Sequence, residues 1–85
     1  MNLLARIQLL NDLIRSKSTG NADQLARQLN VSTRTVYKDI QWMRAKGAPI
    51  VFARQYESYI YEQDVTFLVA FVHPGLVELI RNRSS

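Results

Sequence analysis

The chain contains no cysteine and only one histidine among its 85 residues. The lack of cysteine excludes disulfide bonds, thiolate-bound metal and thiol redox switches. The one histidine, His73, precedes a proline and has no carboxylate cluster beside it, so we expect it at the surface or in an interface. Asp12, Asp23 and Asp39 are spread along the chain without the spacing of metal ligands. We therefore expect no enzyme activity, no metal site and no cofactor.

Long apolar runs are also missing. The longest, Val65–Val72, is too short to cross a bilayer as a helix. Near the N-terminus, Arg6 and Asn11–Asp12 interrupt the apolar residues earlier than a secretory signal would allow. These features predict a cytoplasmic protein with no membrane partner.

The length predicts one domain with a modest core. The net charge is +4, and its distribution is uneven. Residues 1–62 hold nine of the eleven basic side chains and five of the seven acidic ones, whereas residues 63–85 hold two of each. This imbalance is typical of a polyanion-binding module, residues 1–62, followed by an interaction segment, residues 63–85. Ordinary solubilising charge is an equally good explanation of the charge alone.

Two helices are predicted before residue 30. Apolar residues recur at helical spacing over residues 3–17, with Asn2 as the cap, and this face is expected to be buried. Asn21 and Gln24 form a capping-box pair that begins the second helix. Asn30 follows its last apolar residue and suits a left-handed C-terminal position. The expected inward-facing residues are Leu3, Leu4, Ile7, Leu10, Leu13 and Ile14 in the first helix and Leu25, Ala26 and Leu29 in the second.

A third helix is predicted from about Thr33 to Lys46. Val31 is expected to be buried in the turn before it, and Ser32 is its cap. Gly47 ends it, with Pro49 beyond. Its apolar stripe consists of Val36, Ile40 and Met43.

Strand-forming residues follow at Ile50–Ala53 and Ser58–Tyr61, and the four residues between them suit a hairpin. We predict a further strand at Val65–Val72 and a short helix at Pro74–Asn82. One helix from Asp64 onward, kinked at Pro74, is the alternative. The predicted fold class is α+β, mainly α, with a three-helix core, a β-hairpin and a C-terminal strand and helix extension.

The side of the third helix opposite its apolar stripe carries the chemistry of nucleic-acid recognition. Arginine and glutamine can make bidentate contacts with guanine and adenine, and lysine suits phosphate oxygens. An ordinary solvated face remains the alternative. Asp39 is expected to pair with Arg27 or Arg34, and Trp42 to pack at the edge of the core or under the hairpin. The residues expected on this exposed face are Thr33, Arg34, Tyr37, Lys38 and Gln41.

Four segments, Leu25–Ala26, Leu29–Ser32, Thr35–Ile40 and Gly47–Ile50, resemble the winged helix-turn-helix domain of DeoR-type bacterial transcriptional regulators. The resemblance covers residues 4–62. It implies that double-stranded DNA is the partner, that the third helix is the recognition helix and that the hairpin is a wing near the DNA backbone. Carried over by position, the major-groove residues are Ser32, Thr33, Arg34, Tyr37, Lys38 and Gln41, and the wing-tip residues that approach phosphates are Arg54 and Gln55.

Two features depart from that family. The family usually has glycine in the second half of the wing turn, where this chain has Glu57–Ser58, and the acid weakens the expected phosphate contact of the wing. The family normally continues into an effector domain, whereas this sequence stops at residue 85. No small-molecule effector is therefore expected.

An apolar segment on so small a domain needs a cover. Val65–Val72 either packs back on Leu3–Ile14 or joins two copies, and we expect a homodimer formed through residues 63–85. The predicted function is sequence-specific double-stranded DNA binding by a nucleoid-associated transcriptional regulator, with the helix at about residues 33–46 in the major groove. The alternative is a winged-helix protein–protein interaction module that uses the apolar C-terminal segment. Binding of single-stranded nucleic acid is less favoured, since it needs more exposed aromatic residues.

Overall fold

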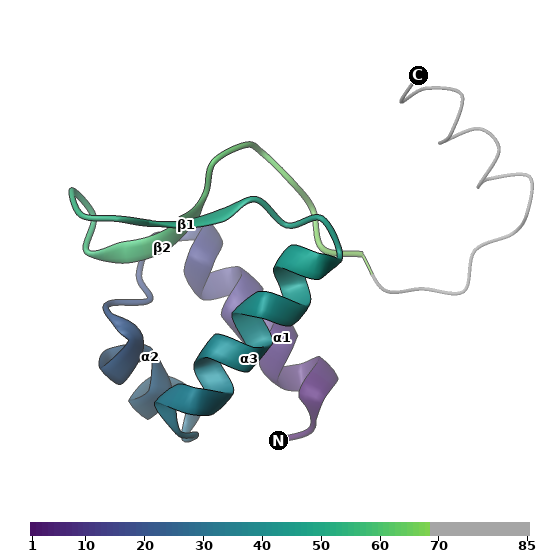
Figure 1. Ribbon diagram of the computed structural model, residues 1–85, viewed down its shortest axis with the longest axis vertical. Coiled ribbons are helices and arrows are strands. Elements are labelled where there is room, and N and C mark those ends of the chain that lie inside the picture. The colour runs from purple at the N-terminus through teal and green to yellow at the C-terminus, as the bar shows by residue number, and fades with distance from the viewer. Residues whose placement is uncertain (69–85) are drawn as a thin grey trace, which may run out of the picture.

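The computed structural model describes residues 1–68 and consists of three helices followed by a two-stranded hairpin (Figure 1). The antiparallel strands pair from Ile50↔Tyr61 to Ala53↔Ser58. This confirms the mainly helical α+β fold of a winged helix-turn-helix, and both strands have their predicted bounds. The elements are α1 (Leu3–Arg15), α2 (Ala22–Leu29), α3 (Thr33–Ala45), β1 (Ile50–Ala53) and β2 (Ser58–Tyr61).

The predicted helix caps are all present. Asn2 Oδ1 accepts a hydrogen bond from the Ala5 N–H at 2.8 Å, and Asn21 and Gln24 form the reciprocal capping box. Asn30 closes α2 in the left-handed conformation, with φ 56° and ψ 48°. Each cap satisfies backbone groups that a helix end leaves without partners, so the helix boundaries follow from local chemistry. The first helix is shorter than predicted, because Lys17 turns left-handed at φ 56° and α1 ends at Arg15.

One apolar core joins all five elements. Helix α2 packs on α3, and β2 packs on α1. Val31, in the turn between α2 and α3, is partly buried and packs against this core. The prediction that Leu3 and Leu4 are buried is wrong: their side chains are 44% and 42% exposed, because they lie in the first turn of α1, beyond the end of the core. The core residues are Ile7, Leu10, Ile14, Leu25, Ala26, Leu29, Val36, Ile40, Met43, Ile50 and Tyr59.

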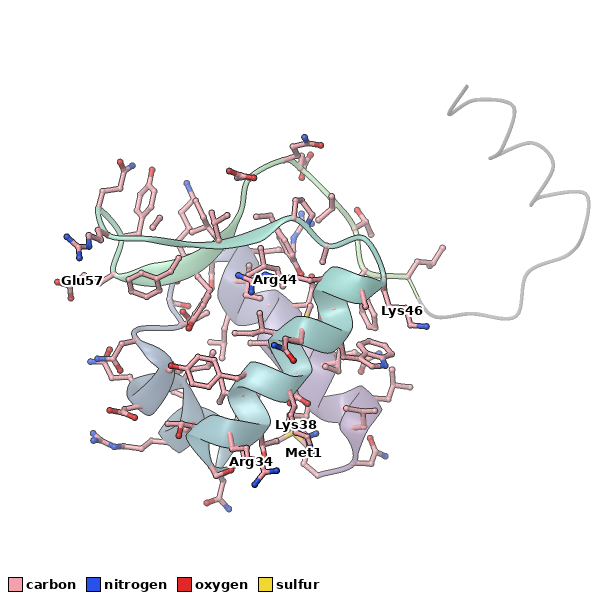
Figure 2. All side chains as sticks on the ribbon, in the orientation of Figure 1. Met1, Arg34, Lys38, Arg44, Lys46 and Glu57 are labelled. Carbon is pink, nitrogen blue, oxygen red and sulfur yellow. The ribbon has the colours of Figure 1, made fainter. Side chains whose placement is uncertain are left out.

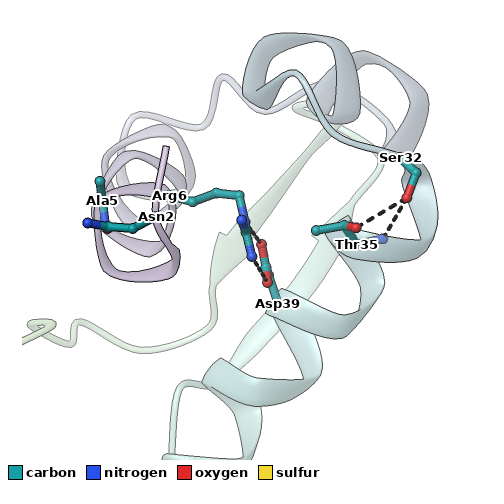
Figure 3. Close-up of polar contacts among 6 residues, drawn as sticks. All are labelled: Asn2, Ala5, Arg6, Ser32, Thr35 and Asp39. Carbon is teal, nitrogen blue, oxygen red and sulfur yellow. Dashed lines mark hydrogen bonds and ion pairs between the residues drawn. The ribbon is translucent and has the colours of Figure 1, made fainter.

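Asp39 pairs with a different arginine from those predicted. Its carboxylate accepts two hydrogen bonds from the Arg6 guanidinium, with Nη2 at 3.0 Å from Oδ1, and so joins α1 to α3 (Figure 3). The predicted pairing with Arg27 or Arg34 is therefore wrong. On a helix that turns by about 100° per residue, Arg34 lies well round the axis from Asp39, which faces α1 and is buried.

Residues 65–68 form no strand, which contradicts the predicted strand as far as the described residues reach. The Val65 carbonyl accepts a hydrogen bond from Arg15 Nη1 at 2.6 Å instead of joining a ladder, and Phe67 packs against the edge of the core. The rest of that strand, the Pro74–Asn82 helix and His73 lie outside the described residues. Among residues 1–68, no helix is both long and apolar enough to cross a membrane.

Candidate nucleic-acid interface

Helix α3 has one buried side and one exposed side. Val36, Asp39, Ile40 and Met43 are buried, and at about 100° per residue the opposite side carries a stripe of exposed side chains. Figure 2 shows Arg34 and Lys38 in the N-terminal half of α3. We call this stripe the outer face of α3; it consists of Arg34, Lys38, Gln41 and Ala45.

The other residues predicted on α3 flank this outer face. Tyr37 is 53% exposed and lies on the side of α3 nearer β2. Burial, and after it the nearby Tyr37 hydroxyl, raise the pKa of Tyr59 in β2. Thr33 is partly buried and Ser32 is exposed. The structure therefore brings Arg34, Lys38 and Gln41 together on one surface, with the remaining predicted side chains at its edge.

The N-terminus of α3 presents free backbone donors beside this surface. Ser32 Oγ accepts from the Thr35 N–H at 3.2 Å (Figure 3). The Val36 N–H donates to the Ser32 carbonyl at 3.1 Å. The N–H groups of Thr33 and Arg34 precede the first intrahelical bond and have no partner within the helix. Together with the positive end of the helix dipole, they can bind an anionic oxygen.

The outer face carries positive charge without a compensating acid. Asp39 is the one carboxylate of α3, and it faces inward and accepts hydrogen bonds from Arg6. These hydrogen bonds, more than the Coulomb attraction to Asp39, raise the pKa of Arg6. Among the residues that the structure describes, Arg6–Asp39 is the only ion pair. Arg34 and Lys38 are therefore available to an external anion.

The hairpin turn places Arg54 and Gln55 in solvent. The turn is closed by hydrogen bonds from the Tyr56 N–H to the Ala53 carbonyl at 3.2 Å and from the Glu57 N–H to the Arg54 carbonyl at 3.1 Å. Glu57 has φ 47°, a left-handed conformation that favours glycine. At Glu57 an acidic residue therefore adopts a backbone conformation that glycine adopts more easily.

Lys17 supports this turn from the end of α1. Its Nζ lies 4.2 Å from the centroid of the Tyr56 ring, a cation–π contact. The hydrogen bond with Gln55, followed by the interactions with Lys17, lowers the pKa of Tyr56. Lys17 thereby adds a basic group to the hairpin turn, against Tyr56.

Two buried hydroxyl groups fix the hairpin to the loop between α1 and α2. The Thr19 N–H donates to Ser58 Oγ at 3.0 Å, and the Tyr59 N–H donates to Thr19 Oγ1 at 2.8 Å. Both Thr19 and Ser58 have no exposed surface. Because a buried donor without a partner is costly, this pair sets the position of the tip end of β2.

Two residues near the C-terminus of α3 were not predicted from the sequence. Ala45 extends the outer face by one turn, and its small side chain would let a nucleic acid come close to the helix. Continuing the helical spacing from Arg34 to position i+11 would have identified it. Arg44 donates two hydrogen bonds to the Ile50 carbonyl, from Nε at 3.0 Å and Nη2 at 2.9 Å. Nothing in the sequence pattern signals this contact, because its acceptor is a backbone atom.

A protein-family model described as an HTH domain, for helix-turn-helix, matches residues 5–57. The chain belongs to the helix-turn-helix domain family. The match covers more than half of the sequence and includes all the residues predicted to contact DNA. Neither the curated proteins nor the solved structures contain a match. The HTH domain is a DNA-binding, non-enzymatic kind of domain, which agrees with the charge and exposure of α3.

Proposed function

We propose that this HTH domain is a sequence-specific, double-stranded DNA-binding transcriptional regulator of the DeoR type from bacteria, with α3 in the major groove. The observation that carries the proposal is the outer face of α3, where exposed Arg34, Lys38 and Gln41 adjoin a helix N-terminus and no carboxylate is present. A duplex offers guanine and adenine edges flanked by phosphates, which are the partners of these groups.

The side chains divide into base-reading and phosphate-binding groups. Arg34 suits the O6 and N7 atoms of guanine, and Gln41 suits the N6 and N7 atoms of adenine. Lys38, the Tyr37 hydroxyl and the N–H groups after Ser32 suit phosphate oxygens, while the Thr33 methyl can meet thymine. Arg54 and Gln55 bind the neighbouring backbone from the hairpin turn, next to Glu57.

The proposal includes a two-fold dimer formed through residues 63–85. One domain presents a single α3, and a symmetric pair doubles the number of bases contacted on a palindromic site. The exposed Leu68, 68% accessible, and the half-exposed Trp42 support an apolar contact between copies. Light scattering at micromolar concentration is expected to give twice the chain mass, and a monomer mass would remove the dimer from the proposal.

The deciding experiment selects duplexes from a random library with the whole chain and measures their affinity by fluorescence anisotropy across a salt series. Lys38→Ala is expected to weaken all duplexes alike and to lower the slope of log affinity against log salt by about 1. Arg34→Ala is expected to cost roughly 1–3 kcal/mol and to relax specificity at one base pair. Lys46→Ala is the matched control, because Lys46 faces the Trp42 side of α3 and not the outer face.

A flat salt response, or unchanged affinity in the Arg34→Ala, Lys38→Ala double variant, would favour a second function. An apolar groove of about 400 Å³ lies between the C-terminal end of α3 and residues 65–68, and it supports a protein–protein interaction module. That module would keep its partner when the outer face is neutralised. The groove is lined by Trp42, Met43, Lys46, Gly47, Ala48, Tyr61, Val65, Thr66, Phe67 and Leu68.

A further inference from the structure

Helix α3 and the hairpin are held mainly by different neighbours. Helix α3 packs on α2, whereas β2 packs on α1. The hairpin is also tied by hydrogen bonds to the α1–α2 loop through Thr19 and to α1 through the Tyr61 hydroxyl, which donates to Asn11 Oδ1 at 2.6 Å. None of these bonds fixes the hairpin relative to α3, although both elements would have to meet the same stretch of DNA.

Arg44 makes that missing connection. Its side chain projects from the side of α3 that faces the hairpin, and in Figure 2 it lies between α3 and the hairpin. Its Nε and Nη2 both donate to the Ile50 carbonyl, at 3.0 and 2.9 Å. Within residues 1–68, these are the only side-chain hydrogen bonds between α3 and the hairpin.

The acceptor sits where the hairpin begins. Ile50 is the first residue of β1, its side chain is 3% exposed, and it pairs with Tyr61 across the sheet. Two donors of one planar guanidinium that converge on a single carbonyl oxygen restrain its direction as well as its distance, which the single ammonium of lysine does not do. Arg44 therefore fixes the angle at which β1 leaves α3.

We propose, on the basis of the DNA-binding function proposed above, that Arg44 is a positioning residue: it holds the hairpin at the angle to α3 at which Arg54 and the outer face of α3 contact one DNA segment together. Its Nε and Nη2 donors are both engaged with the Ile50 carbonyl, so its proposed action is through the hairpin. The affinity supplied by Arg54 then depends on Arg44.

A double-mutant cycle on the selected duplex tests this dependence. Arg54→Ala is expected to weaken binding by about tenfold in the wild type and by less than about twofold once Arg44→Met is present. Arg44→Lys keeps the charge and is expected to lose most of the same coupling. If Arg44 were a direct phosphate ligand, Arg44→Lys would retain affinity, Arg54→Ala would cost the same factor in both backgrounds, and the proposal would be overturned.

A second measurement needs no DNA. Because the chain has no cysteine, Gln41→Cys and Gln55→Cys place two spin labels uniquely, one on α3 and one on the hairpin. The distance distribution is expected to be narrow with Arg44 and broad in Arg44→Met and Arg44→Lys, at unchanged helix content by circular dichroism. If Arg44→Met does not fold, Arg44→Lys carries both comparisons.

The two measurements separate the two proposals. Identical distance distributions in all variants would overturn the role of Arg44 whatever the protein binds. If the wild-type chain selects no duplex, yet the distance distribution broadens in the Arg44 variants, the DNA-binding function is rejected and the positioning role of Arg44 stands.

Discussion

Replacing Glu57 by glycine should both stabilise the domain and strengthen its binding to DNA. Glu57 holds the left-handed conformation at φ 47° in the hairpin turn, and it brings a negative charge next to Arg54. Glycine adopts this conformation without the clash of a Cβ atom. The two effects have separate causes, so they can be measured separately.

The stability gain follows from two opposing terms. A non-glycine residue in the left-handed region costs roughly 1–2 kcal/mol, and the larger entropy of glycine in the unfolded chain offsets about 0.5–1 kcal/mol of that. With the middle of each range, the net gain in the free energy of unfolding is about 0.8 kcal/mol. For a domain of this size, the midpoint of thermal unfolding should rise by roughly 2–8 °C.

The binding gain comes from the charge. Glu57 is exposed, and a carboxylate near a phosphate in water opposes binding by about 1 kcal/mol at 4 Å and by less at longer range. Its removal should raise the affinity for the selected duplex by roughly two- to fivefold, most clearly at low salt. Anisotropy titrations at two salt concentrations measure this change.

Glu57→Gln is the control that divides the two effects. It removes the charge and keeps the Cβ atom, so it should match the affinity of Glu57→Gly while its melting temperature stays near that of the wild type. The reasoning is refuted if Glu57→Gly melts no higher than Glu57→Gln. Equal affinity of the wild type and both variants would instead show that the turn does not approach DNA.

Two further predictions concern how the hairpin is held. Ser58→Ala leaves the buried Thr19 N–H without an acceptor and should lower the free energy of unfolding in urea by about 1–3 kcal/mol. Ser18→Ala, at an exposed position, should lower it by less than about 0.5 kcal/mol. Equal losses would contradict the role of the buried pair. Burial, more than nearby charges, raises the pKa of Tyr61, whose hydroxyl donates to Asn11. A raised folded-state pKa contributes stability that is complete below the unfolded value near 10 and is lost as pH rises through the folded value. The urea midpoint of the wild type should therefore fall above about pH 10, and that of Tyr61→Phe should fall less. An equal fall in both proteins would reject the contribution of Tyr61 to this pH dependence.

The sequence was sufficient for features that depend on neighbouring residues. Asn21 with Gln24, Ser32 and Asn30 act on backbone groups within four positions, so their residue types alone located the ends of α2 and the start of α3. The outer face of α3 followed from helical spacing once the apolar stripe was recognised. Whether those side chains contact DNA stays a prediction.

Features that join distant segments could not be predicted. Arg6 meets Asp39 across 33 positions, and Thr19 meets Ser58 across 39, and neither pair has a spacing that distinguishes it from other polar residues. The strand expected after residue 64 was wrong over residues 65–68. A high β propensity means that a side chain fits a sheet, and it does not supply a partner strand. Here the Val65 carbonyl accepts a hydrogen bond from Arg15 instead.

Among residues 1–68, the hairpin places the buried side chains of Ile50 and Tyr59 in the core and the partly buried Tyr61 against it, so apolar packing restrains its orientation only in part. Directional hydrogen bonds supply the rest, because they fix angles that non-directional burial leaves free. The bonds through Thr19 and Tyr61 attach the hairpin to α1 and its loop. Within residues 1–68, Arg44 alone makes side-chain hydrogen bonds between the hairpin and α3. If α3 moved relative to α1, the hairpin would stay with α1 unless the Arg44–Ile50 hydrogen bonds held it to α3. The spacing between the two proposed DNA-contacting surfaces therefore also depends on the contact between α1 and α3. The Arg6–Asp39 pair joins the same two helices, α1 and α3.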